Sequence, residues 1–283
     1  MIAAWLQAIL DAQLLLWREF SPAWWAAIVA GATLPALGVQ VAFRGQALTT
    51  LAIPQVSFAA MALALAIPGF ALTDAHEPSM LVMLAAAFAG ALLGGLLAGQ
   101  RQDQHAPLRM GAVFVGAWAL TETVRALSPV GEMRLEPLLH GELLGASPST
   151  AGLVALLVLP CAVILALQRR LSFCAAFPDA ALAAGLNTRR LERGLALMLG
   201  AAIALGTVTL GPLVTAALLL LPAALAARNA PSAISMLRRA MLTGVLAALL
   251  GSIASVLADI PLGAAIALAC VPIGLCISAL QRR

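Results

Sequence analysis

The sequence has 283 residues, of which 63% are hydrophobic and only 10% are charged, and its mean hydropathy is +1.02. A water-soluble protein needs far more charge to cover its surface, so this composition excludes that class, and no hydrophilic stretch is long enough for a soluble catalytic domain. The formal net charge of +4 comes from arginines in short loops, a distribution that does not indicate a nucleic-acid partner. We therefore predict an all-α, polytopic helical membrane protein whose energy source is a partner or an ion gradient.

The first 20 residues predict a helix that lies on the membrane rather than one that crosses it. The stretch lacks the basic start and the small-residue cleavage site of a signal peptide, and Asp11 interrupts its apolar run. Gln7, Asp11 and Arg18 fall on roughly one helical stripe, opposite apolar residues. We expect residues 1–20 to form an interfacial amphipathic helix and residues 21–283 to form the transmembrane domain.

The rest of the chain is a series of apolar segments, most of them long enough to cross a bilayer as a helix. The sixth and seventh segments are short and nearly continuous, so we predict eight or nine transmembrane helices. Small residues recur at four-residue spacing at Ala86, Gly90 and Gly94, which predicts close helix packing within the chain or between two copies. The predicted segments are residues 22–43, 51–72, 79–99, 108–128, 149–168, 194–211, 212–227, 238–258 and 262–281.

The positions of the arginines predict the orientation of the chain in the membrane. The loops that contain most of the arginines share one side of the predicted topology, whereas the opposite loops contain mainly acidic residues. Because arginine-rich loops tend to remain in the cytoplasm, we expect this side and the C-terminus to be cytoplasmic. The arginine-rich positions are Arg44, the loops 101–109, 169–193 and 228–239, and the terminal Arg282–Arg283.

The long loop between the fifth and sixth apolar segments has the pattern of two consecutive helices. Pro178 and Asp179 are typical of a helix start, and Gly185 and Asn187 are typical of a helix end. Two helices lying across this face would give a docking surface for another protein, although an ordinary connecting loop fits the same residues. The second helix carries Arg189, Arg190 and Arg193.

This loop resembles the coupling segment of permeases in the zinc/manganese family of ATP-binding-cassette importers. In FPDAALAAGLNTRRLE, Asp179, Ala181 and Gly185 match the acidic residue, the alanine and the glycine of that family, and a basic stretch follows. The resemblance implies that residues 175–193 couple the membrane subunit to an ATPase. The residues expected to do so are Asp179, Ala181, Gly185, Asn187, Arg189 and Arg190.

Three further stretches resemble motifs of the same family in the same order, and the similarity covers about residues 23–281. Together with the coupling segment they give four ordered matches, which is a far more specific signal than any single motif. The matches are LLHGELLGAS at 138–147, with His140 in place of the usual phenylalanine, LGPLVTAALLLLPAALAAR at 210–228, through Gly211 and Pro222, and ADIPLGAAIAL at 258–268, through Asp259, Pro261 and Gly263.

Two of these motifs also predict turns from the residues alone. Gly211 and Pro212 break a helix near the outer face, and the backbone groups that they free must be buried in protein or line a wet cavity. Asp259, Pro261 and Gly263 form a tight turn back into the membrane, in which Asp259 either caps the following helix or binds substrate.

The resemblance implies the membrane subunit of an importer in a bacterial inner membrane. It implies a homodimer surrounded by lipid, two cytoplasmic ATPase subunits and a soluble substrate-binding protein on the outer side, with no cofactor and no catalytic residue in this chain. Two other classes remain open. A secondary transporter would need inverted repeats and charges at the membrane midplane, and an intramembrane enzyme would need a catalytic arrangement such as HExxH or GxSxG.

The stretch LAIPQVSFAA, residues 51–60, bears on what is transported. The resembling permeases place an aspartate and a histidine four residues apart here, where both face the pathway and suit Mn²⁺ or Zn²⁺. This chain has Pro54 and Phe58 at those positions, so the metal site does not carry over. We still expect Pro54, Gln55, Ser57 and Phe58 to line or border the pathway, with Pro54 beginning or opening the helix. The cargo is then a metal ion with ligands from elsewhere, a metal chelate or another small polar solute.

Few other residues are candidates to replace the missing ligands. Glu122 lies inside an apolar segment, which makes it a candidate pathway residue, but an ion pair with Arg125 three residues later explains it equally well. His76 lies beside two acidic residues and either binds metal in an outer loop or is solvated or in contact with a binding protein. His105 and His140 are expected to be loop residues, and the four cysteines are expected to be small buried hydrophobic residues.

Overall fold

The computed structural model describes residues 21–67, 80–98, 105–127, 135, 148–228, 230–258 and 260–280. The secondary-structure elements in this part of the chain are all helices, which confirms the all-α prediction. The predicted helix over residues 1–20, His76, His140 and Asp259 lie outside the described residues. The elements are α2 (Ser21–Phe43), α3 (Thr49–Ala66), α4 (Met80–Ala98), α5 (Ala106–Leu127), α7 (Pro148–Ala155), α8 (Val158–Ala176), α9 (Pro178–Ala183), α10 (Thr188–Leu210), α11 (Pro212–Ala227), α12 (Ala233–Ala258) and α13 (Leu262–Leu280).

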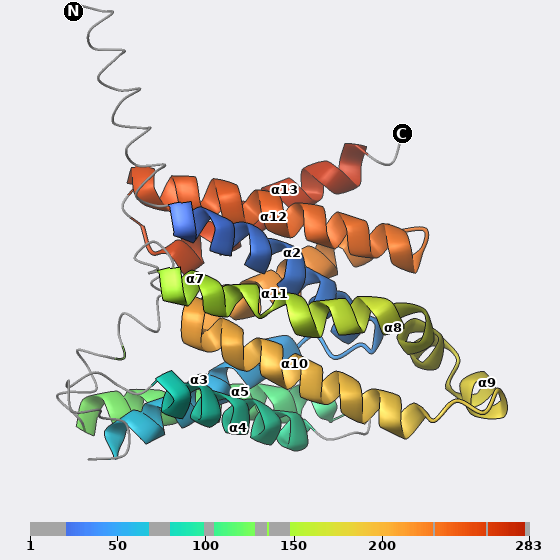
Figure 1. The fold of residues 1–283 in the computed structure, drawn as a ribbon, viewed down its shortest axis with the longest axis horizontal. Helices are drawn as coiled ribbons and strands as arrows, with labels where there is room; N and C mark the ends of the chain where they lie inside the picture. Colours follow the sequence, from blue (N-terminus) through green and yellow to red (C-terminus); the bar gives the residue numbers. More distant parts are fainter. Residues whose placement is uncertain are drawn as a thin grey trace, which may run out of the picture.

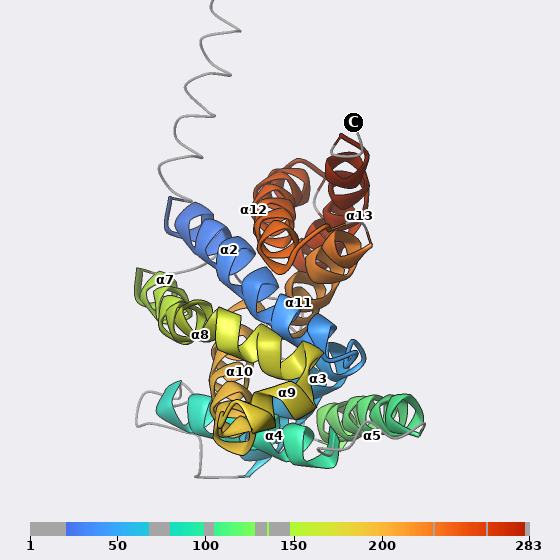
Figure 2. The same cartoon turned by 90° about the vertical axis from the view of Figure 1, so that its right-hand side faces the viewer.

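The helices pack as two groups that run roughly in parallel across the molecule (Figure 1). In one group α2 packs against α11 and α12, and α13 packs against both α11 and α12. In the other group α3 packs against α4 and α5, and α10 packs against α4. The two groups meet through α11, which contacts α3 and α10, and through α8, which contacts α2 and α10 (Figure 2).

The described residues of each of the nine predicted apolar segments lie mainly in helices. Within the described residues, six helical stretches are long and apolar enough to cross a membrane, and α11 and α13 supply two shorter apolar helices. The structure differs most at the starts of α10 and α12, which begin at Thr188 and Ala233 rather than at 194 and 238. Both helices continue past the apolar stretch into the arginine-containing residues, so hydropathy alone placed their starts too late.

The fifth predicted segment is divided into α7 and α8 by a turn at Leu156 and Leu157. In this turn the N–H groups of Leu156 and Leu157 donate to the carbonyls of Leu153 and Val154 at 3.1 and 3.0 Å, which is a tighter bonding pattern than that of an α-helix. Pro160 has no N–H to donate to the Leu156 carbonyl, so regular α-helical bonding is interrupted at this point.

Glycines allow the closest helix contacts, as the small-residue spacing predicted. A Cβ atom at Gly90 on α4 would lie 2.7 Å from Ala60 Cβ and 2.8 Å from Ser57 Cα, both on α3. A Cβ atom at Gly31 on α2 would lie 2.6 Å from the carbonyl oxygen of Gly244 on α12. Gly90 therefore packs within the chain, whereas Gly95 on the same helix has no atom within 4 Å of an added Cβ.

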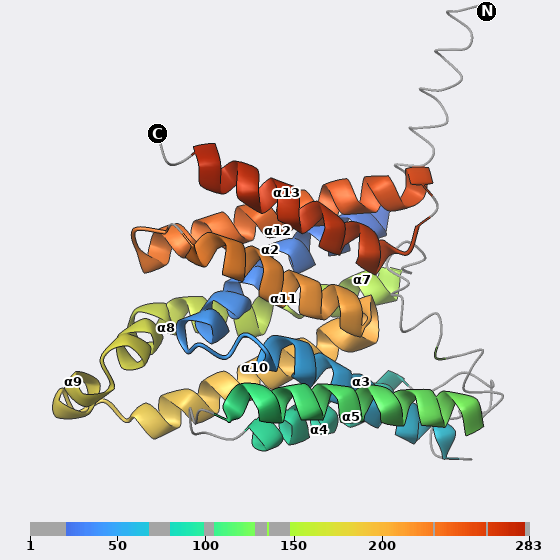
Figure 3. The same cartoon turned by 180° about the vertical axis from the view of Figure 1, so that it is seen from behind.

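The arginine-containing connections gather at one end of the molecule. The turn between α2 and α3, the segment α9, the turn between α11 and α12 and the end of α13 lie at the right-hand end in Figure 1. Seen from behind in Figure 3, the start of α5 lies at that same end. This grouping agrees with the predicted topology, and the assignment of this end to the cytoplasm stays a prediction.

Candidate functional site

The predicted coupling segment is a short helix that projects from the arginine-containing end of the molecule. Figures 1 and 2 show α9 beyond the ends of α8 and α10, and among the described residues its main contacts are with these two helices. Pro178 occupies the first turn of α9, where the missing N–H costs nothing, and exposed Asp179 places a carboxylate at the positive end of the helix. The predicted helix start at these two residues is confirmed.

The end of α9 is formed at Gly185, as the sequence indicated, whereas Asn187 belongs to the start of α10. Gly185 has φ +75°, its N–H donates to the Leu182 carbonyl at 3.0 Å, and the Leu186 N–H donates to the Ala181 carbonyl at 3.0 Å. This left-handed turn ends the helix. Asn187 then begins α10, because its side-chain oxygen accepts a hydrogen bond from the Arg190 N–H at 3.1 Å.

Two apolar side chains on this segment are exposed, and the sequence analysis did not select them. Phe177 is 61% exposed and Leu182 is 59% exposed, whereas Ala181 between them is completely buried. The charged residues Asp179 and Arg189 are exposed nearby, as is Arg190. An apolar centre flanked by charges is the composition of many protein–protein contacts. One sequence signal could have indicated that Phe177 is exposed. It directly precedes the proline that starts the helix, and it lies outside any apolar repeat.

Arg44 connects the helix pair α2–α3 to the base of the coupling segment. Its guanidinium Nη1 donates to the Gln40 carbonyl at 2.8 Å, and Nη2 makes a longer contact of 3.5 Å with the Leu171 carbonyl on α8. Burial lowers the pKa of Arg44, and the negative charge of Glu192 on α10 opposes this shift. The sequence analysis used Arg44 only for orientation, because nothing in the chain order brings residue 44 to residues 171 and 192.

The four predicted pathway residues are all buried on α3, between α4, α5 and the helices of the other group. The Ser57 hydroxyl donates to the Ala87 carbonyl on α4 at 2.7 Å, and Phe58 is completely buried in an apolar cluster with Met61 and Met83. Gln55 is only 4% exposed, and its side-chain nitrogen has no hydrogen-bond partner among the described residues. In this single chain the four predicted pathway residues make interior contacts. That they lie along a transport pathway stays a prediction.

The expectation that Pro54 begins or opens the helix is wrong. Helix α3 begins at Thr49, and Pro54 lies inside it in the second turn. The Ala52 N–H already donates to the Leu48 carbonyl at 3.0 Å, so helical bonding is established before the proline. A proline at this depth removes one hydrogen bond, and the remaining turns of α3 are held by packing.

Glu122 forms the ion pair that was the alternative to a ligand role. The Arg125 side chain donates to a Glu122 carboxylate oxygen through Nε at 3.0 Å and approaches the same oxygen through Nη2 at 2.8 Å. Both side chains are partly exposed on α5, in its last two turns. The pair balances the carboxylate charge, so a ligand role for Glu122 would require it to exchange partners.

The two predicted turns lie at the opposite end of the molecule from α9. Gly211 has φ +83° and separates α10 from α11, and its carbonyl accepts hydrogen bonds from the Thr215 hydroxyl at 2.8 Å and the Thr215 N–H at 3.2 Å. The Ser255 hydroxyl donates to the Ile260 carbonyl at 2.7 Å in the turn that contains Pro261 and leads to Gly263. The Gly211 and Ile260 carbonyls are therefore satisfied within the protein. Pro222 is buried inside α11.

The described residues contain no group of three histidine, cysteine or acidic side chains that could hold a metal ion. Cys161, Cys174 and Cys270 are buried and Cys276 is exposed, and all four are free thiols. Three of the four cysteines thus agree with the expectation of small buried hydrophobic residues. His105 is exposed at the start of α5.

Comparisons with known proteins agree with this architecture. The family model of the ABC 3 transport family matches residues 18–281, and no curated protein matched. The solved structure of PsaBC from Streptococcus pneumoniae, in complex with a Fab, is similar with a TM-score of 0.74 and 20% identity, over 98% of this chain and 95% of that chain. A structure described as an inward-facing metal-chelate type ABC transporter is similar with a TM-score of 0.70 and 18% identity, over 93% of this chain and 87% of that chain. Because the family model covers nearly the whole sequence, this protein belongs to the ABC 3 transport family.

Proposed function

We propose that this chain is the permease subunit of an ATP-binding-cassette importer that carries a divalent transition metal of the zinc/manganese class, or a metal-related solute, across a bacterial inner membrane. Two copies form the membrane domain, two ATPase subunits dock at the arginine-containing end in the cytoplasm, and a binding protein delivers cargo at the other end. ATP hydrolysis belongs to the separate ATPase subunits. The C-terminus is cytoplasmic in this arrangement.

The observation that carries this proposal is the geometry of the coupling segment. Helix α9 projects from the molecule and presents exposed Phe177 and Leu182 beside charged residues. A partner that covers these two side chains removes apolar surface from water, and Asp179, Arg189 and Arg190 offer charge complementarity at its rim. A loop that only connects α8 to α10 would need neither exposed apolar side chains nor charged residues around them.

The contacts around α9 suggest how movement of the ATPases reaches the pathway. Closure of the ATPases on ATP pushes α9, which is attached directly to α8 and α10. Arg44 contacts α8 through the Leu171 carbonyl and lies near Glu192 of α10, and α3 begins five residues after Arg44. A shift of α8 and α10 is therefore passed to the start of the helix that carries Pro54 to Phe58.

The residues on α3 favour a second candidate for the cargo. Pro54 and Phe58 stand where resembling permeases have a carboxylate and an imidazole, and Gln55 and Ser57 bring neutral polar groups only. Neutral groups offset the dehydration of a divalent ion poorly, because they carry no opposing charge. A metal chelate, or another small polar solute, is compatible with such a wall. The transporter described as metal-chelate type is similar in fold, and its description names this second cargo class.

The test is transport in proteoliposomes that contain the permease, its ATPase and the cognate binding protein. We expect Zn²⁺ or Mn²⁺ to stimulate ATP hydrolysis and to accumulate inside. Glu122→Gln and Arg125→Gln form a matched pair: a ligand role predicts that only Glu122→Gln abolishes metal uptake, whereas a structural ion pair predicts similar effects of both. If neither ion stimulates ATP hydrolysis or accumulates inside, but a metal chelate does, the cargo is the chelate and not the free ion. An ATPase that neither binds nor responds would overturn the importer assignment.

A further inference from the structure

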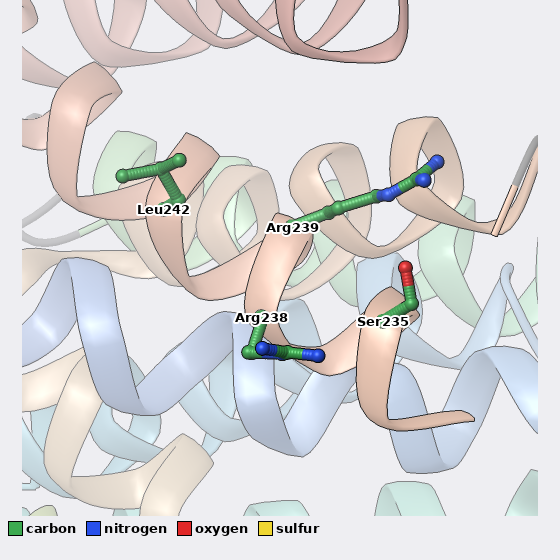
Figure 4. A pocket seen from close by; sticks show the side chains of 4 residues that line it. All are labelled: Ser235, Arg238, Arg239 and Leu242. Atoms are coloured by element: carbon green, nitrogen blue, oxygen red, sulfur yellow. The ribbon is translucent and has the colours of Figure 1, made fainter. Parts of the chain in front are cut away.

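A hollow of about 450 Å³ lies beside the beginning of α12, and none of its lining residues belongs to the coupling segment or to the predicted pathway (Figure 4). Its lining residues are Ser235, Arg238, Arg239 and Leu242. These positions recur at spacings of three and four residues, so they form one face over the first turns of the helix. Figure 4 shows the Ser235 hydroxyl pointing to the side where the Arg239 guanidinium lies.

The two arginines that line the hollow bring positive charge, and the described helices around it contribute no acidic side chain. Arg238 is exposed and Arg239 is 8% exposed, so one guanidinium faces outward while the other lies against the protein. The helices α2, α11, α12 and α13, which form this group, contain no aspartate or glutamate in their residue ranges. Guanidinium groups bind phosphate oxygens through paired N–H donors, and a serine hydroxyl adds a further donor. The chemistry of the hollow therefore fits a phosphate group.

The length of α12 is compatible with a position of the hollow at the depth of lipid headgroups. The helix has 26 residues, which is about 39 Å at 1.5 Å per residue, whereas the hydrocarbon core of a bilayer is about 30 Å thick. A helix of this length extends beyond the hydrocarbon at one or both ends, and the start of α12, where Arg238 is the sixth residue, is its arginine-containing end. Leu242, one turn further into the membrane, is exposed and can contact an acyl chain.

We propose that this hollow binds the phosphate headgroup of an anionic phospholipid. Arg238 and Arg239 contact the phosphate, Ser235 donates a hydrogen bond to it, and Leu242 packs against the first acyl carbons. A cluster of basic residues near the end of a membrane helix, at headgroup depth, is a setting in which anionic lipids are retained. An acidic protein surface is a less suitable occupant, because exposed Leu242 needs an apolar neighbour at that side. This site does not depend on the cargo or on the docking of an ATPase.

The experiment uses the purified full-length protein in detergent, with thermal unfolding and native mass spectrometry as readouts. We compare phosphatidylglycerol, phosphatidylcholine and inorganic phosphate as additives to wild-type protein and to the variants Arg238→Gln and Ser235→Ala. Arg169→Gln is the matched control, because it removes one exposed arginine from α8. A ligand present at a hundredfold excess over its Kd is expected to raise the Tm by about 5 °C for a chain of this size.

We expect phosphatidylglycerol, and not phosphatidylcholine, to raise the Tm of wild-type protein and of Arg169→Gln. The rise should fall to less than half in Arg238→Gln, and Ser235→Ala should reduce it by a smaller amount. An equal rise in Arg238→Gln, or equal effects of the two lipids, would overturn the proposal. If inorganic phosphate alone gives the rise, the occupant is a soluble anion. If Arg238→Gln keeps the lipid effect but no longer binds the ATPase, the hollow is a protein contact.

Discussion

Substitution of Gly185 is the most direct test of the coupling segment. Its effect would come from the backbone conformation of this residue and not from contacts of a new side chain with neighbouring atoms. Its φ of +75° lies in the left-handed region, and an added Cβ would meet no atom within 4 Å. The cost of Gly185→Leu therefore comes from the backbone and is about 1–2 kcal/mol. That cost lowers the population of the native turn roughly 5- to 30-fold relative to alternative conformations. The membrane helices should remain intact, because a Cβ added at Gly185 would meet no described atom within 4 Å.

The matched control is Ala184→Leu, which adds the same exposed side chain one residue earlier, where φ is −76°. Gly185→Asn should restore most of the function, because asparagine tolerates the left-handed region better than leucine. The assay is the stoichiometry of co-purified ATPase together with substrate-stimulated ATP hydrolysis in the reconstituted complex. Full stoichiometry and full stimulation in Gly185→Leu, or an equal loss in Ala184→Leu, would refute the reasoning from the turn geometry.

Three further predictions follow from packing, charge and topology. Gly90→Leu should destabilise the protein by about 1–3 kcal/mol in thermal unfolding, whereas Gly95→Leu, which faces open space, should have little effect. Arg44→Glu should lower transport per ATP hydrolysed without loss of assembly, and the added substitution Glu192→Arg should restore part of it; no restoration would argue against their electrostatic contact. In a cysteine-free background, a cysteine at Ala230 should resist an impermeant thiol reagent in intact cells, whereas one at Ser79 should react, and the reverse pattern would invert the topology.

Local sequence signals predicted those parts of the fold that depend on backbone chemistry. The start of α9 at Pro178 and its end at Gly185 follow from the missing N–H of proline and the conformational freedom of glycine. The division between α10 and α11 at Gly211 follows from the same two residue types in reverse order. In each case the determining atoms lie within a few residues of one another, so the sequence contains the whole cause.

Features that depend on contacts between distant residues were not predictable in this way. The sequence analysis did not select Phe177, because only the projection of α9 leaves its side chain exposed. Arg44 and Leu171 are 127 residues apart in the chain and meet only because α2 packs against α8. The start of α3 before Pro54 was also not predictable from the local sequence. Packing of α3 against α4 and α5 compensates for the hydrogen bond that the proline removes.

The contacts of α3 also restrict how cargo can be selected in the proposed importer. The Ser57 hydrogen bond to Ala87 and the close approach at Gly90 join α3 and α4, so these helices move as one unit when the turn at Arg44 is displaced. A unit that moves without internal rearrangement keeps Pro54 and Phe58 in fixed positions relative to each other, and neither can supply charge to a bare ion in any state of the cycle. Discrimination between metal ions then cannot come from these two positions. It comes from ligands elsewhere in the chain, for which Glu122 is the candidate, from the binding protein that delivers the cargo, or from the ligands of a chelate that keeps the ion coordinated during passage.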